Sequence, residues 1–105
     1  MQICLLHLDD ALKSQPTFMA SCKQAGAKQI EAEEIGKKIR LWGKAEDFEP
    51  LQVKLAEHFT NANKPQLFFM GSGDFHHITA FLLAATLKKL GEPITLIHFD
   101  NHPDW

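Results

Sequence analysis

Short apolar runs alternate with amphipathic stretches along the 105 residues of this chain. Three runs are apolar at nearly every position, which is typical of strands buried on both faces of a sheet. They cover Gln2–Leu8, Gln66–Met70 and Pro93–Phe99. Two further segments, Gln29–Ala32 and Lys38–Trp42, alternate apolar and polar residues as half-exposed strands do, so they are expected to pair as a hairpin or to lie at a sheet edge.

Apolar residues at helical spacing separate these strands. A proline in the first turn and a glycine just past the end indicate a helix over Pro16–Gln24. A second helix is predicted over Asp47–Thr60, and a third over Ile78–Leu90, which is apolar over most of its surface and is therefore expected to be buried. The alternation of strands and helices predicts α/β architecture, in which residues 1–105 form one domain with a three-layer parallel sheet flanked by helices.

Composition and charge exclude several classes of protein. Hydrophobic residues make up 45% of the chain and charged residues 23%, as in ordinary globular domains. The net charge of −2 and the scattered lysines argue against nucleic acid as a partner. The chain has neither a secretory signal nor an apolar run that could span a bilayer, so we expect a cytoplasmic protein without a membrane partner. Cys4 and Cys22 form no CxxC motif and are expected to be reduced and buried.

The segment Asp100-Asn101-His102-Pro103-Asp104 follows the last predicted strand. In extended backbone, residues two apart point the same way, so Asp100, His102 and Asp104 would converge, and Pro103 biases His102 towards that conformation. Two carboxylates and an imidazole suit a divalent ion such as Mn²⁺, Fe²⁺ or Zn²⁺. The same string also occurs in solvated turns, but the carboxyl end of a parallel strand is where open α/β sheets place their sites.

A second polar segment, Gly-Ser-Gly-Asp-Phe-His-His at residues 71–77, follows the preceding strand. We expect Asp74 to cap the next helix or to orient a histidine, and either His76 or His77 to bind a metal. A phosphate-binding loop is disfavoured because no Lys-Ser/Thr pair follows the glycines. At the end of the first strand, alternation puts His7 and Asp9 on one face, where they either support the site or form an ordinary polar strand exit.

These two segments resemble motifs of the ureohydrolases, the arginase, agmatinase and formiminoglutamase family, whose fold histone deacetylases share. Gly73-Asp74-Phe75-His76-His77 resembles the family's Gly-Gly-Asp-His-Ser-like segment, and Asp100–Asp104 resembles its Asp-Ala-His-x-Asp segment. A predicted helix and strand separate the two, as the family requires. Phe75 is inserted before the histidines and Asn101 replaces a small residue, so the pattern is that of a divergent member. The match covers about the last third of the chain.

The resemblance implies an arginase-like fold and a site for two divalent ions, Mn²⁺ or else Fe²⁺, Co²⁺ or Zn²⁺. It implies hydrolysis of a linear C–N bond in a small-molecule guanidino or amidine substrate. Four ligand positions would lie in this chain: His76 or His77, Asp100 as a bridge, His102 and Asp104. The remaining ligands and the acid–base residues would follow Trp105, so we expect an amino-terminal part that is inactive alone.

Two alternatives to this enzyme stay open. One is a deacetylase-like amidohydrolase on the same scaffold, and the other is a non-catalytic α/β binding module. Family members form homo-oligomers, which the sequence of this chain neither requires nor excludes.

Overall fold

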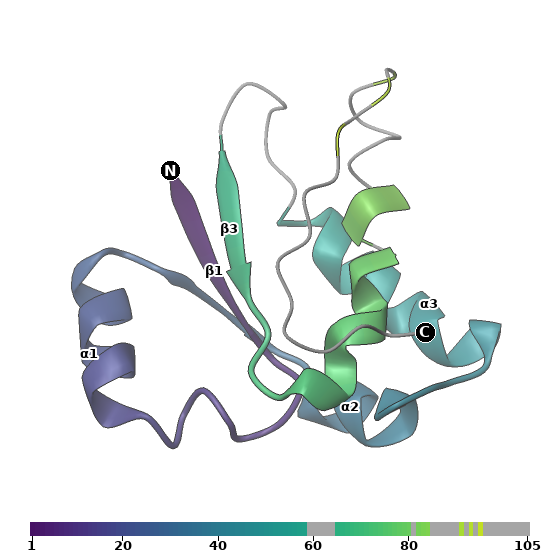
Figure 1. The fold of residues 1–105 in the computed structure, drawn as a ribbon, viewed down its shortest axis with the longest axis horizontal. Coiled ribbons are helices and arrows are strands. Elements are labelled where there is room, and N and C mark those ends of the chain that lie inside the picture. The colour runs from purple at the N-terminus through teal and green to yellow at the C-terminus, as the bar shows by residue number, and fades with distance from the viewer. Residues whose placement is uncertain (59–64, 81, 85–90, 92, 94, 96–105) are drawn as a thin grey trace.

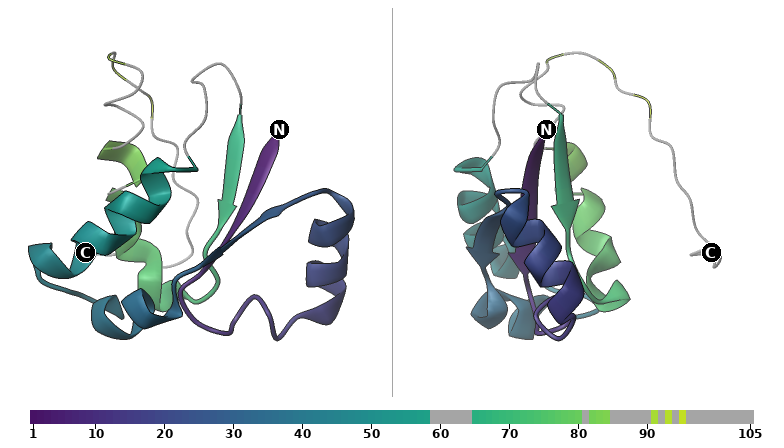
Figure 2. Two further views of the ribbon diagram at one scale, coloured as in Figure 1. Left: turned by 180° about the vertical axis from the view of Figure 1, so that it is seen from behind. Right: turned by 90° about the vertical axis from the view of Figure 1, so that its left-hand side faces the viewer.

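The structure is a computed structural model that describes residues 1–58, 65–80, 82–84, 91, 93 and 95. Its elements are, in order, β1 (Gln2–His7), α1 (Pro16–Gln24), β2 (Lys28–Glu31), α2 (Glu33–Ile39), α3 (Ala45–Ala56), β3 (Gln66–Phe69) and the 3₁₀ helix η1 (Gly73–Ile78). The strands form a parallel sheet in the order β2-β1-β3. One face of the sheet carries α1, and the other carries α2, α3 and η1 (Figure 1, Figure 2). The described residues therefore have α/β architecture.

The middle strand, β1, is buried on both faces of the sheet. Cys4 and Leu6 belong to the larger core on the side of α2 and α3, whereas Leu5 packs with Cys22 under α1. This division follows from the alternation of side chains along a strand. The prediction of a buried strand at the amino terminus is confirmed. Both cysteines are free thiols and buried, as expected, and burial raises the pKa of the Cys4 thiol.

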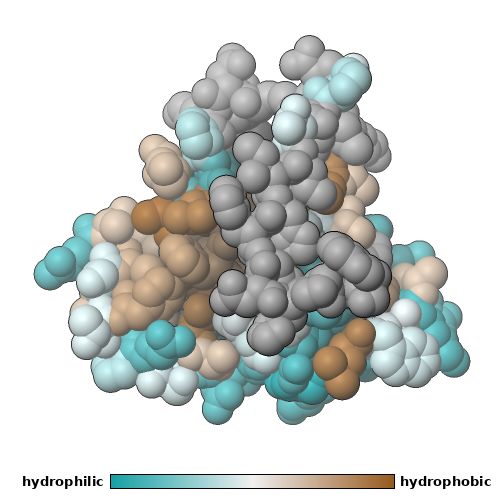
Figure 3. Space-filling view, in the orientation of Figure 1, coloured by the Kyte–Doolittle hydropathy of each residue, from teal (hydrophilic) through white to brown (hydrophobic). Residues whose placement is uncertain are grey.

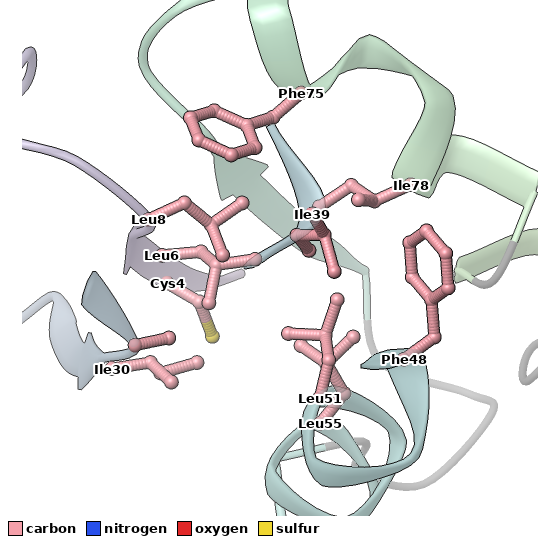
Figure 4. Packing of buried hydrophobic residues seen from close by; sticks show 11 residues of the cluster. Cys4, Leu6, Leu8, Ile30, Ile39, Phe48, Leu51, Leu55, Phe75 and Ile78 are labelled. Carbon is pink, nitrogen blue, oxygen red and sulfur yellow. The ribbon is translucent and has the colours of Figure 1, made fainter. Parts of the chain in front are cut away.

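The larger core fills the space between the sheet and the helices on its second face. Figure 4 shows the side chains of β1 and β2 converging with those of α2, α3 and η1. The labelled side chains, each at most 6% exposed, are Cys4, Leu6, Leu8, Ile30, Ile39, Phe48, Leu51, Leu55, Phe75 and Ile78. Close packing of this kind fixes α2 and η1 relative to β1.

The segment predicted as a strand over Lys38–Trp42 is not a strand. Its first residues complete α2, and those that follow Ile39 are irregular. The hairpin alternative is therefore wrong. The edge alternative is confirmed for the segment Gln29–Ala32, because β2 pairs in parallel with β1 at one edge of the described sheet. Acidic residues occupy the first turn of α2 and lysines its last turn, which favours the helix because both complement its dipole.

The other predictions of secondary structure differ mainly at their boundaries. The strand β3 and the helix α1 are confirmed. The predicted second helix begins at Ala45 and ends at Ala56, and Thr60 lies outside the described residues. None of the helices formed by the described residues is long and apolar enough to cross a membrane.

The helix predicted from Ile78 is preceded by η1, and residues 79–80 and 82–84 continue it as α-helix. Ile78 is fully buried and Leu82 packs against the larger core, but the other described residues of this stretch are half-buried or exposed. The burial expected of this helix is therefore found only in part. Most of the strand predicted over Pro93–Phe99 lies outside the described residues. Pro93 and Thr95, which are described, are not in a strand.

An apolar area of the surface lies between α1 and β3 (Figure 3). Phe18 of α1 and Phe69 of β3 meet edge to face on this side of the sheet, with ring centroids 4.9 Å apart. Leu67 of β3 is 41% exposed. Among the described elements, α1 thus covers this face of the sheet only in part.

The helix α2 lies very close to the end of β1. A Cβ atom at Gly36 would be 1.9 Å from the carbonyl oxygen of Leu8, far inside van der Waals contact. Gly36 is therefore needed here for its lack of a side chain. The close approach also brings the end of α2 next to the residues that follow β1.

Replacing Gly36 with alanine should lower the free energy of unfolding by about 1–3 kcal/mol, because the helix must move away from β1. The same change inside an unconstrained helix usually stabilises by roughly 0.5–1 kcal/mol. Urea denaturation measures the difference. Gly73→Ala is the control, since a Cβ there meets nothing within 4 Å; a Gly36→Ala protein as stable as this control would contradict the prediction.

Leu41, just after α2, adopts a left-handed backbone conformation with φ of 70°. Its side chain is 62% exposed, so the residue gains little from burial. The conformation is held by a hydrogen bond of 2.9 Å from the Leu41 amide to the carbonyl oxygen of Asp74. Leucine at this position therefore carries backbone strain that the contact with η1 offsets.

Leu41→Gly should leave stability unchanged or raise it by up to about 1 kcal/mol, because glycine adopts this conformation without strain. Leu41→Val should lower it by about 1 kcal/mol, since a β-branched residue is worse there than leucine. Thermal and urea unfolding of the two variants test this. Equal losses in both would show that the position carries no strain.

Candidate functional site

The carboxyl ends of the three parallel strands meet at one edge of the sheet, at the lower end of the strands in Figure 1. The chain runs from β1 to β2 on one side, and then to β3 on the other side of β1. The order of the strands thus reverses between β1 and β3, which is where open α/β sheets bind their ligands. Asp9 follows β1 at this edge, and η1 with Asp74, His76 and His77 follows β3.

Arg40 bridges the two acidic residues of this edge. Its Nη1 donates a hydrogen bond of 2.5 Å to Asp74, and its Nη2 donates one of 3.1 Å to Asp9. Asp9 also accepts a hydrogen bond of 3.0 Å from the backbone amide of Ala11. Arg40 thereby joins the residues after β1 to the turn after β3.

The charges of this bridge stabilise one another. Hydrogen bonding to Asp74 and then to Asp9 raises the pKa of the Arg40 guanidinium above its usual range. The guanidinium also lies over the ring of Phe75, 4.9 Å from its centroid, and that ring is fully buried. One planar cation thus contacts two carboxylates and an aromatic face.

Three consecutive residues at the end of α2 bind η1. The carbonyl oxygen of Ile39 accepts a hydrogen bond of 2.7 Å from His77 Nε2. The side chain of Arg40 binds Asp74, and the amide of Leu41 donates to the Asp74 carbonyl oxygen. The position of η1 is therefore set by α2 as well as by β3.

The two histidines of η1 have different surroundings. His77 is half-buried, and its ring packs edge-on to Phe48 at 5.9 Å between centroids. With Nε2 donating to Ile39, its Nδ1 carries a lone pair that is buried and has no hydrogen-bond partner within the described part of the chain. His76 is exposed, and its Nδ1 donates to the Gly73 carbonyl oxygen at 2.8 Å. Such a backbone contact orients a ring for ligation through its other nitrogen.

The roles expected for Asp74 need correction. Ser72, not Asp74, caps η1, because its Oγ accepts the hydrogen bond from the Asp74 amide at 3.2 Å. The Asp74 carboxylate pairs with Arg40, and no hydrogen bond joins it to a histidine of the described residues. A guanidinium fork is the stronger partner for a carboxylate, which accounts for the difference.

His7 and Asp9, which alternation was expected to place on one face, contact different partners. The strand β1 ends at His7, and the alternating pattern ends with it. His7 is fully buried, with its Nε2 only 2.5 Å from the Gln29 side-chain oxygen, whereas Asp9 contacts Arg40. His7 is therefore part of the contact between β1 and β2.

The predicted ligands Asp100, His102 and Asp104 lie outside the described residues. Within the described ranges, no three His, Cys, Asp or Glu side chains come together as a metal-binding group. The structure thus joins Asp9 and Asp74 through Arg40 and places the turn with the two histidines after β3 at the same edge. The relation of these residues to the Asp-x-His-x-Asp segment stays a prediction.

Sequence reasoning missed Arg40, which is central to this edge. The residue lies inside the segment interpreted as a strand, and its partners are 31 and 34 residues away in the chain. No local pattern signals such a pairing. The only clue to Arg40 is indirect: two acids at one edge of a sheet are expected to pair with a cation.

A hollow lies beside the end of β2, apart from the edge that Arg40 bridges. It has a volume of about 400 Å³ and is lined by Lys13, Glu31, Ala32, Glu33, Glu34 and Lys54. Both lysines that line it already have partners. Lys13 forms ion pairs with Glu31 and Glu33. Lys54 donates a hydrogen bond to the carbonyl oxygen of Glu31. The hollow is best explained as a solvated cluster of surface ion pairs.

Comparison with known proteins gives one short similarity. No family model matches this chain, and no solved structure matches it. A protein of Thermotoga maritima described as an uncharacterized protein is 47% identical over 36 residues. Those residues are 34% of this chain and only 13% of that protein. The similarity covers too little of either chain to show a family, so the activity is argued from the site.

Proposed function

We propose that this chain contributes to a divalent-metal site of arginase type, in a protein that hydrolyses a linear C–N bond of a guanidino or amidine substrate. The observation that carries the proposal is the position of the histidine-bearing turn η1 at the carboxyl edge of a parallel sheet, next to the reversal of strand order. The Asp-x-His-x-Asp segment at residues 100–104 supplies three further donors. The arginase-like form of the α/β fold belongs to the same proposal.

The side chains of η1 fit a borderline divalent ion. The buried Nδ1 of His77 has a lone pair with no partner among the described residues, and its other nitrogen is held by a backbone carbonyl. A metal-binding histidine has the same arrangement, because the second nitrogen fixes the ring and the tautomer. This favours His77 over His76 as the ligand. Neutral imidazole together with carboxylates suits Mn²⁺, Fe²⁺, Co²⁺ or Zn²⁺.

Asp9 and Asp74 are better suited to supporting this site than to binding the metal. Both carboxylates are already paired with Arg40, whose positive charge disfavours a second cation at the same oxygens. The negative charge that a divalent ion needs would come from Asp100 and Asp104. In such a site, a bound metal supplies Lewis-acid activation of water near neutral pH.

Metal titration of the purified chain tests the proposal. Mn²⁺ and Co²⁺ should bind the wild type, and His102→Ala and His77→Ala should each weaken binding at least about tenfold, since each removes a donor. His76→Ala should have a smaller effect. His58→Ala is the control, because His58 lies beyond the end of α3 and outside both motifs.

Circular dichroism of each variant separates loss of a ligand from loss of the fold. The metal proposal fails if the wild type binds neither ion, or if His102→Ala binds as tightly as the wild type does. Hydrolysis of the C–N bond is tested separately, by release of urea or ammonia from guanidino compounds in a longer protein that contains this chain.

A further inference from the structure

We infer that Arg40 is a positioning residue: by joining Asp9 to Asp74 it fixes the turn η1 and, through it, the ring of His77. This deepens the proposed function, because it names a residue that prepares the histidine for metal. The placement of the ring is, however, a property of the protein without metal. It can therefore be tested even if the proposed metal site fails.

The geometry of Arg40 suits it to hold two loops at a fixed separation. Its two terminal nitrogens reach different carboxylates, Nη1 to Asp74 and Nη2 to Asp9. A guanidinium is rigid and planar, so the two acids are held at a set distance and orientation. Lysine would keep the charge but offers a single nitrogen on a flexible stem, which cannot impose the same separation.

The guanidinium is itself held in place by the core. It lies over Phe75, which is completely buried between the sheet and α2. Asp9 is only 13% exposed, so the arm of the bridge towards β1 is shielded from solvent. Both features make the bridge stronger than an ordinary surface ion pair.

The bridge acts on His77 through the residues on either side of Arg40. Ile39 accepts the hydrogen bond from His77 Nε2, and Leu41 donates one to the Asp74 carbonyl oxygen. Leu41 does so in a strained conformation, which relaxes unless the neighbouring contacts hold it. Without Arg40, moreover, Asp9 and Asp74 would be unpaired acids at one edge and would repel each other. Loss of Arg40 should therefore loosen the contact that orients the imidazole.

Lys13 offers a matched control elsewhere on the surface. Like Arg40 it bridges two carboxylates, those of Glu31 and Glu33. Its side chain is 41% exposed and that of Arg40 is 45% exposed. Lys13→Gln thus removes a comparable cation from a pair of acids that does not touch η1.

The first measurement follows the His77 side-chain N–H by nuclear magnetic resonance in the metal-free protein. In the wild type and in Lys13→Gln, this hydrogen should be protected from exchange by its bond to Ile39. In Arg40→Gln its exchange should be about tenfold faster or more, since the local contact opens more often. Arg40→Lys should give an intermediate rate, and a rate equal to that of Arg40→Gln would show that the two-armed geometry matters and not the charge.

The second measurement is the affinity for Mn²⁺ or Co²⁺. Arg40→Gln should lower it by about tenfold to a hundredfold, as is usual when the support of a ligand is removed, whereas Lys13→Gln should leave it unchanged. If the wild type binds neither ion, the proposed function fails and the exchange measurement alone decides the role of Arg40.

Unchanged exchange of the His77 N–H in Arg40→Gln would overturn the inference, whatever the metal does. If Arg40→Gln does not fold, Asp74→Asn and Asp9→Asn take its place, since each removes one arm of the bridge. Faster exchange in Asp74→Asn than in Lys13→Gln would support the inference. Exchange equal to that of Lys13→Gln in both would reject it.

Discussion

The burial of β1 on both faces is the constraint on which the rest of this structure depends. A strand that is apolar on both sides needs a layer of helices on each, and α1 supplies one while α2, α3 and η1 supply the other. Chain connections that cross these faces make the neighbouring strands parallel to β1. All carboxyl ends then meet at one edge, and the polar residues that follow β1 and β3 are brought together there. The proximity of Asp9 to η1 is thus a consequence of how the core is built.

Electrostatics then divides the polar residues of this edge into two groups. Two acids pair with one arginine and so join three segments of the chain. The histidines of η1 carry no part of that bridge, although the backbone next to Arg40 holds one of them. The carboxylates of the first group are already occupied by a cation, whereas the second group offers an imidazole nitrogen without a partner among the described residues. This division supports imidazole, and not the carboxylates of the described residues, as the donor that the turn offers.

The elements predicted best from sequence are those whose signal is local. β1 and β3 are apolar runs, and α1 has a proline at its start and a glycine after its end. The strand predicted over Lys38–Trp42 was wrong because alternation over five residues fits either state. The helical state is decided by contacts with residues distant in the chain: Gly36 lies against Leu8, and Ile39 is buried in the larger core. Arg40 was missed because its partners come from other elements. The cap by Ser72 was missed because Ser72 and Asp74 are both residues that cap helices, and they lie only two positions apart.

The strand order also bears on when during folding this edge can form. β1 and β2 are close in the chain and can pair early, but β3 completes the other side of β1 with residues as far apart as Gln2 and Gln66. Contacts between such distant residues close large loops and tend to form late. During synthesis on a ribosome, one side of β1 would stay unpaired until β3 emerged. The turn that bears the histidines follows β3, so we expect its geometry to form only once β3 has paired and to be lost when β3 detaches.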